Sequence, residues 1–133
     1  MAAVTVVKAR PVSPPAYEVN DKGQAAVAFT AGQLLCLSTT TPGNGFEKVW
    51  QLAPTSGITE AQGVALMDAK AGGIASVGIQ GEMDGFSGLT PGPTQSPLYP
   101  STAVAGGLDT TAIVSATVRI RAVTTTRIRY SFV

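Results

Sequence analysis

The sequence has no histidine and only one cysteine, Cys36, so it can form neither an intrachain disulfide nor a zinc site of the usual kind. Without histidine, no common catalytic triad can form. Aromatic residues make up only 6% of the chain and charged residues only 13%, about half the share of a typical globular domain. We therefore expect no cofactor, no small-molecule substrate and no enzymatic activity.

The chain also lacks any long apolar run. None reaches the roughly 18 residues that a membrane helix needs, so we expect no membrane partner. Residues 1–11, MAAVTVVKARP, lack the order of basic and then apolar residues that is typical of a signal peptide, so synthesis inside a cell is the expectation. The net charge is only +1, which demands neither nucleic acid nor an anionic membrane as a partner.

What the chain does contain is small apolar residues. The hydrophobic fraction of 44% comes mostly from alanine and valine, so the core is expected to be thin. At 133 residues the chain is long enough for one domain, and a second domain is not expected. A thin core favours the burial of further surface against copies of the chain or against a partner, so we expect an oligomer.

The stretch from residue 62 to 108 is central to the prediction of the fold, because short apolar runs alternate there with glycine and proline. Residues 74–82 alternate apolar with small polar positions, which indicates a strand with one buried face. We predict an all-β, single-domain protein, a small barrel or sandwich with a β-tulip-like meander and little or no helix. Further strands are expected at 2–9, 25–30, 33–38, 46–52, 113–122 and 126–133, with 25–30 and 33–38 forming a hairpin or a bulged pair. We also expect a turn at 20–23 and at most one helical turn within 54–61.

The first residues allow two interpretations. Residues 2–9 alternate in the manner of a strand, and the proline-rich residues 11–15 cannot continue a ladder. The strand either belongs to the sheet of its own domain or is an arm that orders by adding to the sheet of a partner. The division we adopt is an extended N-terminal arm with its connector at 1–15 and an all-β domain at 16–133. The contact residues of the arm are then Val4, Val6, Lys8 and Arg10.

Arginine is concentrated near the C-terminal end, where it alternates strictly with apolar residues in two short segments. If these segments pair, Arg119, Arg121, Arg127 and Arg129 share one face of a sheet. This face could be solvated, could contact acidic patches of other subunits, or could bind phosphate. Nucleic acid normally brings more lysine or stacking aromatics, so we do not expect it as a partner. Trp50 is expected to anchor the core or a subunit contact.

The middle of the chain is acidic, and Glu82 and Asp84 lie two residues apart on the same face of the expected strand. Paired carboxylates can serve glycoside hydrolysis, but on a polar strand face they are usually just solvated. An acidic middle and an arginine-rich end suit head-to-tail or self-complementary contacts between molecules.

Several short motifs follow one another in an order that carries more information than any of them alone. They are TAGQLLCL at 30–37, EKVW at 47–50, GVALMDAKAG at 63–72, an apolar strand ending near Gly81, GLTPG at 88–92, LY at 98–99 and AGGL at 105–108. In this order they resemble the head-decoration, or capsid cement, proteins of tailed bacteriophages over residues 23–133. The sequence departs from the family in its long, proline-rich loop at 90–100.

The resemblance implies a small all-β domain that is usually trimeric. Such a protein lies on the outer surface of the virion, at three-fold or quasi-three-fold positions of the capsid, after synthesis in the cytoplasm of the bacterial host. It binds the major capsid protein and clamps neighbouring capsomers. In related proteins an N-terminal arm pairs with a strand of the major capsid protein, which fits residues 2–9 here by position but not by any specific motif. We expect Val4, Val6, Lys8 and Arg10 to contact the capsid, and Trp50, Arg119, Arg121, Arg127 and Arg129 to contact other subunits or the capsid.

Two rival interpretations remain open. A module of a tail fibre or baseplate would also be a virion protein, but it would contact a host surface and have no affinity for empty heads. A major coat protein of a small RNA phage is suggested by length alone, and the arginine-rich strands at the end of this chain lie where those coat proteins carry helices.

Overall fold

The computed structural model describes residues 3–12, 18–43, 45–55, 61–93, 95–110 and 118–132. Every regular element in these ranges is a strand, and the prediction of a small, single, all-β domain with a closed barrel is confirmed. The strands are β1 (Ala3–Pro11), β2 (Val19–Ala25), β3 (Leu34–Ser38), β4 (Val49–Leu52), β5 (Gly63–Ala65), β6 (Ile74–Ser87), β7 (Pro97–Pro100), β8 (Leu108–Asp109), β9 (Ile120–Ala122) and β10 (Ile128–Ser131).

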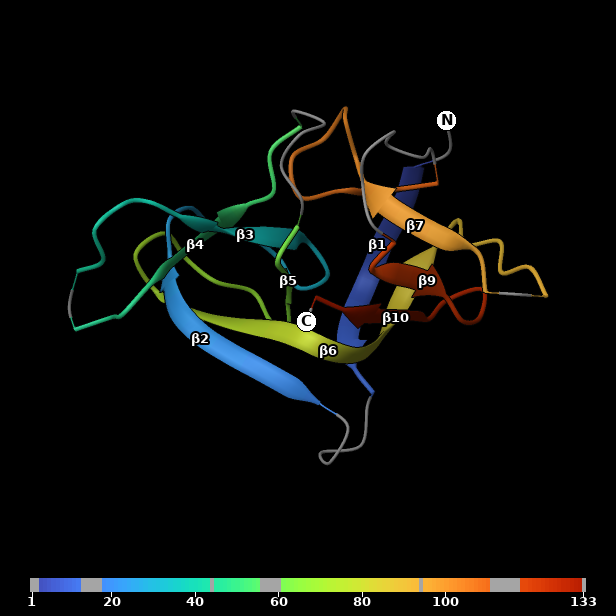
Figure 1. Cartoon of the computed structure of the whole chain (residues 1–133), viewed down its shortest axis with the longest axis horizontal. Coiled ribbons are helices and arrows are strands. Elements are labelled where there is room, and N and C mark those ends of the chain that lie inside the picture. The colour runs from blue at the N-terminus through green and yellow to red at the C-terminus, as the bar shows by residue number, and fades with distance from the viewer. Residues whose placement is uncertain are drawn as a thin grey trace.

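Strand β6 is the longest strand, with 14 residues, and it belongs to two closed rings of strand pairing. Its second half pairs with β10 and β1, which close a six-stranded barrel in the order β1-β8-β7-β9-β10-β6. Its first half pairs with β2 and β5, which close a smaller ring through β4 and β3. The two rings are the two lobes that lie side by side in Figure 1, and β6 runs through both.

The sequence of β6 accounts for its place in both rings. Val77 points into the smaller ring and Met83 into the barrel, as the alternation of apolar positions requires. The alternation then changes phase before Phe86, which is also buried in the barrel. Gly85 lies at this change with a φ of 96°, and a methyl group there would collide with the carbonyl oxygen of Lys8. This bulge lets one strand keep apolar side chains inside the barrel up to its end.

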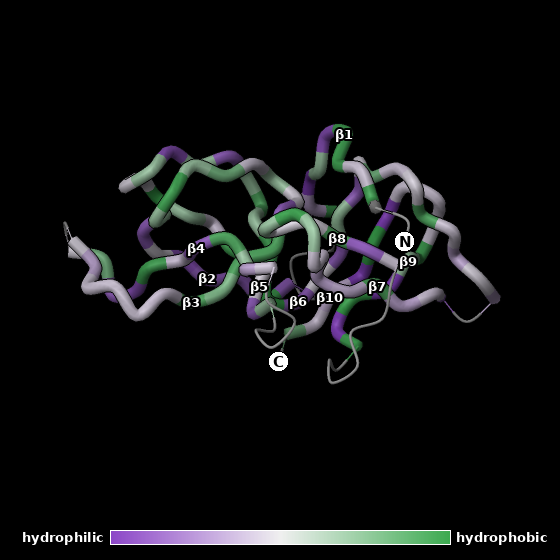
Figure 2. The backbone as a smooth tube through the Cα atoms, turned by 90° about the horizontal axis from the view of Figure 1, so that it is seen from above, coloured by the Kyte–Doolittle hydropathy of each residue, from purple (hydrophilic) through white to green (hydrophobic). Residues whose placement is uncertain are grey.

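Each ring has its own core. In the smaller ring Trp50 is only 2% exposed, and a Cβ atom on Gly23 would lie 2.7 Å from its Cδ1. This close packing explains the glycine, and the prediction of a turn at 20–23 is wrong, because these residues pair with β6 inside β2. Figure 2 shows apolar residues along strands of both lobes. The fully buried larger side chains of the barrel include Phe86, Met83, Leu98, Ile120, Ile128 and Tyr130.

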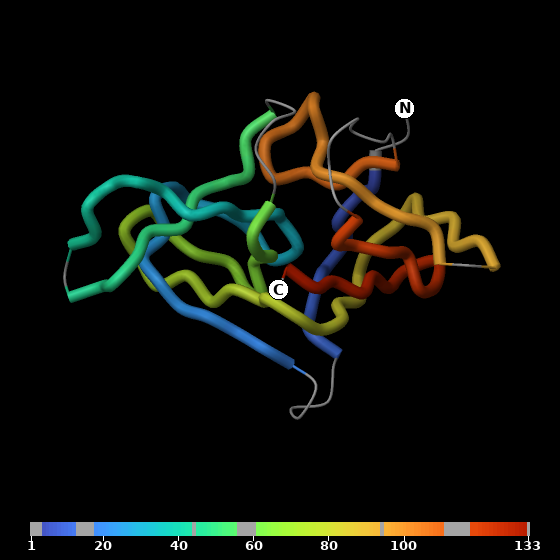
Figure 3. The backbone as a smooth tube through the Cα atoms, viewed as in Figure 1, coloured from blue at the N-terminus to red at the C-terminus, as the bar shows by residue number. Residues whose placement is uncertain are grey.

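The structure agrees with the first of the two interpretations of residues 2–9, in which the strand belongs to the sheet of its own domain. Strand β1 pairs with β6 and β8, and Val4 is buried in the barrel core. Residues 3–11 are therefore not a separate arm in this structure, because they close the barrel. Figure 3 shows the blue and red segments that hold β1 and β10 in the same lobe. Most of the predicted proline-rich connector, at 13–15, lies outside the described residues.

The predicted hairpin of 25–30 with 33–38 is also wrong. Strand β3 pairs with β4 and β5, and residues 26–30 contribute only an isolated bridge between Phe29 and Ala69. The turn at Gly32 carries the chain towards β1 instead, where a Cβ on Gly32 would lie 2.8 Å from that of Ala9. The predicted helical turn and the first part of the predicted strand at 113–122 fall mainly on residues 56–60 and 111–117, which lie outside the described residues.

Candidate functional site

The two arginine-bearing segments pair as predicted. Strands β9 and β10 are antiparallel, and Ile120 lies opposite Tyr130 with both side chains buried in the barrel. Because side chains alternate along a strand, Arg121 and Arg129 point outwards, and they lie directly opposite each other. The prediction that the arginines of these strands share one sheet face is confirmed for this pair.

The neighbouring strands supply partners for these two arginines. Arg129 lies opposite Glu82 of β6 and donates from Nε and Nη2 to the same oxygen, Oε2, at 3.1 and 3.0 Å. On the other side, Nη1 of Arg121 donates to the backbone carbonyl oxygen of Gln95 at 2.9 Å. Glu82 therefore serves as an ion-pair partner on the outer face of the barrel.

Asp84 occupies the next outward position of β6 and is surrounded by donors and cations. The hydroxyl of Thr126 is the main cause of its lowered pKa, and the amide of Gly85 and the charges of Arg10 and Arg127 act in the same direction. Nη2 of Arg10, on β1, lies 3.4 Å from Oδ2 of Asp84. The two carboxylates of β6 are thus matched by arginines from the strands on either side.

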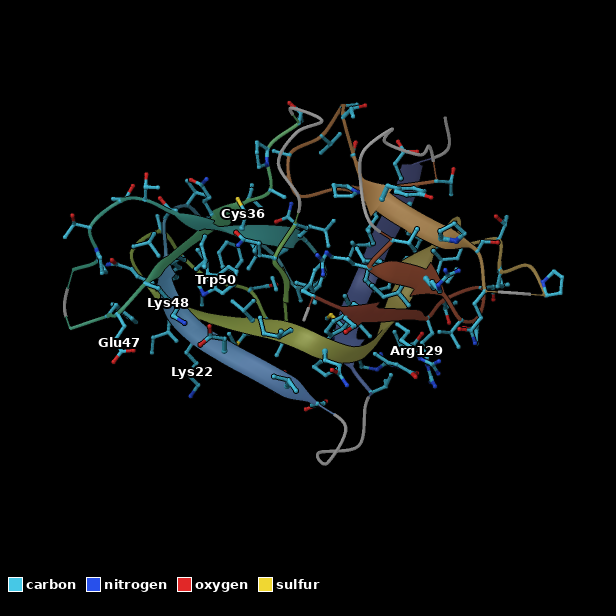
Figure 4. All side chains as sticks on the ribbon, viewed as in Figure 1. Lys22, Cys36, Glu47, Lys48, Trp50 and Arg129 are labelled. Atoms are coloured by element: carbon cyan, nitrogen blue, oxygen red, sulfur yellow. The ribbon has the colours of Figure 1, made fainter. Side chains whose placement is uncertain are left out.

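All five arginines of the chain gather around β6 on the outside of the barrel, and we call this surface the arginine face. With its two carboxylates it carries five positive and two negative side chains, a net charge of +3, whereas the whole chain carries only +1. Figure 4 shows Lys22 and Lys48 in the other lobe, away from Arg129. The members of the face are Arg10, Arg119, Arg121, Arg127 and Arg129, with Glu82 and Asp84.

Within the arginine face there is a shallow groove of about 270 Å³. Arg119, Arg121 and Arg129 line it together with Gln80, Val118, Tyr130 and Ser131. Sequence reasoning predicted the three arginines but not Gln80, Ser131 or the addition of Arg10 to the same face. The one sequence feature that could have placed Gln80 on this face is the alternation of small polar residues along β6.

Charges in the smaller ring are more evenly matched. Nζ of Lys48 lies 2.7 Å from Oδ2 of Asp21. Partial burial raises the pKa of Asp21, but hydrogen bonds from Lys48 and from the amide of Lys22 outweigh this effect, so its pKa is lowered overall. This lobe therefore offers no surface of one sign comparable to the arginine face within the part that the structure describes.

The structure corrects two predicted contacts. Trp50 is enclosed in the core of the smaller ring, so it anchors the core and cannot reach a second subunit or a capsid. Val4 is buried in the barrel and Val6 packs against its core, so neither is a free contact of an arm. Lys8 and Arg10 of β1 are exposed, as predicted for contact residues.

A second groove lies between the lobes, along β1. The side chain of Val7 there is 71% exposed and that of Met67, from the facing loop, is 54% exposed. Lys8 and Asp68 also line this groove. Sequence reasoning missed Val7 and Met67, although the opposite direction of Val7 relative to Val6 was visible in the alternation.

No protein-family model matches the chain, and no curated protein is found to be similar to it. Within the described ranges, no group of three or more histidine, cysteine, aspartate or glutamate residues could hold a metal ion. The same part of the chain contains no helix long and apolar enough to span a membrane.

Proposed function

We propose that the chain is a structural virion protein that binds the outer surface of a tailed-phage capsid and joins neighbouring capsomers. It acts as a homotrimer at three-fold or quasi-three-fold positions. Two lines of reasoning support the proposal: the ordered motifs over residues 23–133 that resemble capsid cement proteins, and the concentration of charge on one outer face of the barrel.

The arginine face is the observation that carries the proposal. Arg10, Arg121 and Arg129 stand on paired strands, so the barrel fixes the backbone that carries them and little backbone order has to be gained on docking. Arginine binds carboxylates through a planar fork of donors and is enriched in protein interfaces. A fixed surface with a net charge of +3 suits contact with an acidic protein surface.

The interlobe groove provides a second contact of different character. Val7 and Met67 expose apolar side chains on both sides of it, and the burial of exposed apolar groups by a partner is favourable. We assign this groove to contacts within the trimer and the arginine face to the capsid. A trimer that engages the shell at several points gains strength from multivalency even where each contact is weak.

The test uses heads purified from a mutant of the same phage that lacks this chain. The added protein is expected to sediment with the heads, to protrude at three-fold positions in a cryo-electron microscopy map, and to raise the temperature at which the heads break open. Analytical ultracentrifugation of the free protein is expected to give the mass of a trimer. No density on the heads, together with binding to host cells or glycans, would favour the tail-fibre or baseplate alternative and contradict the proposal.

A further inference from the structure

The arrangement of Arg121 and Arg129 is unfavourable in the free protein. They occupy directly opposite positions on adjacent antiparallel strands, where Cβ atoms are about 5 Å apart and like charges repel. Glu82 gives Arg129 a negatively charged partner, whereas Arg121 donates to the carbonyl oxygen of Gln95, a neutral acceptor. Residues that break a local rule of stability in this way often mark a functional site.

The groove around this pair is small, and three arginines line it. Its volume of about 270 Å³ is just below the range of roughly 300–1,000 Å³ for pockets that enclose whole small ligands. Gln80 and Ser131 add neutral polar side chains to the arginines along its wall. Such a set of groups suits a carboxylate, which accepts several hydrogen bonds at once.

The groove is less suited to nucleic acid. Single-stranded nucleic acid is held largely by bases that stack on exposed aromatic rings. Among the described residues that line the groove, Tyr130 is the one aromatic residue, and its side chain is only 1% exposed within the barrel. The chain therefore offers charge here without a surface on which bases can stack.

We propose that this groove binds glutamate or aspartate side chains on an acidic segment of the major capsid protein. The inference rests on the proposed function and adds the chemistry of the partner and the residues that recognise it. Arg121 is the principal residue, because a carboxylate from the partner would give it the counter-charge that Glu82 gives Arg129. Docking then removes the repulsion between the two arginines as well as forming new hydrogen bonds.

The test compares Arg121→Gln with Lys70→Gln on heads that lack the chain. Both variants remove one positive charge, but Lys70 lies on an exposed turn of the other lobe. At about 50 mM NaCl we expect Arg121→Gln to bind roughly tenfold more weakly than the wild type, and Lys70→Gln to bind within about twofold of it. Raising the salt to about 300 mM should weaken the wild type more than Arg121→Gln. Circular dichroism and thermal unfolding check that both variants are folded.

Poly-L-glutamate and a single-stranded DNA oligonucleotide serve as probes of the chemistry. We expect poly-L-glutamate to compete with the heads for the wild type, and to bind Arg121→Gln more weakly. If the wild type binds heads and Arg121→Gln binds them equally well, the inference is wrong while the proposed function stands. If the wild type does not bind heads at all, the proposed function itself fails. If the oligonucleotide binds in a way that depends on Arg121, and poly-L-glutamate does not compete with the heads, the groove binds nucleic acid. The inference that it binds carboxylates is then wrong.

Discussion

The contact between Gly78 and Tyr130 gives a sharp test of how the two rings are joined. Gly78 lies where β6 passes between the rings, and a methyl group on it would collide with the Tyr130 hydroxyl and lie 2.9 Å from Cδ2 of Leu66. The hydroxyl is buried without a hydrogen-bond partner among the described residues. Burial raises the pKa of Tyr130, with a smaller contribution from Glu18, so the hydroxyl stays protonated at neutral pH.

Three variants separate the effects of the methyl group and of the hydroxyl. Gly78→Ala should lower the free energy of unfolding by about 2 kcal/mol, because overpacking forces rigid groups apart. Tyr130→Phe should be neutral or stabilising by about 1 kcal/mol, because it removes a polar group that lost its water and gained no partner. In the double variant the cost of Gly78→Ala should fall by about 1 kcal/mol, since the contact with the hydroxyl is gone while those with Leu66 and with the ring carbon Cζ at position 130 remain.

The assay is urea unfolding followed by the fluorescence of Trp50, the single tryptophan of the chain, which is buried in the smaller ring. A loss of about 2 kcal/mol corresponds to a shift of roughly 1 M in the urea midpoint. Far-ultraviolet circular dichroism reports on both lobes and should give the same midpoint. The reasoning is refuted if Gly78→Ala unfolds with the midpoint of the wild type, or if Tyr130→Phe is destabilised by more than about 1 kcal/mol.

Three further predictions follow from the packing and the charges. Trp50→Ala should cost about 3–5 kcal/mol by thermal unfolding, and a loss below about 1 kcal/mol would show that the side chain is not buried. The pKa of Asp84 is lowered in the folded state from its ordinary value of 3.8, so its stabilising contribution is present above that pH and is lost as the pH falls through the folded pKa. Thr126→Val should raise this pKa in a carboxyl NMR titration, and an unchanged titration would show that the Thr126 hydroxyl does not act on Asp84. Gly85→Ala should destabilise the barrel by more than about 1 kcal/mol in urea, since it meets both a positive φ and the Lys8 carbonyl, whereas wild-type stability would show that the bulge can relax.

The alternation of apolar and polar residues determined much of this protein by itself. It was sufficient to predict an all-β domain, the strand at 74–82 and the shared face of Arg121 and Arg129. The physical reason is that side chains of a strand alternate between its faces, so the pattern of burial is written locally in the sequence. The pairing of the two arginine strands was equally local, because only a few residues separate them.

The tertiary structure alone decided which strands meet when they are distant in the sequence. The residues at 20–23 are typical of a turn, yet Gly23 lies in a strand. A side chain at this position would collide with Trp50, which is 27 residues away in the sequence. Arg10 joins the arginine face through Asp84, 74 residues further along the chain. Such pairings arise when β6 closes two rings at once, and ring closure depends on how all strands satisfy their backbone hydrogen bonds together. No local pattern encodes that closure, so the sequence could supply the arginines but not the surface on which all five of them assemble.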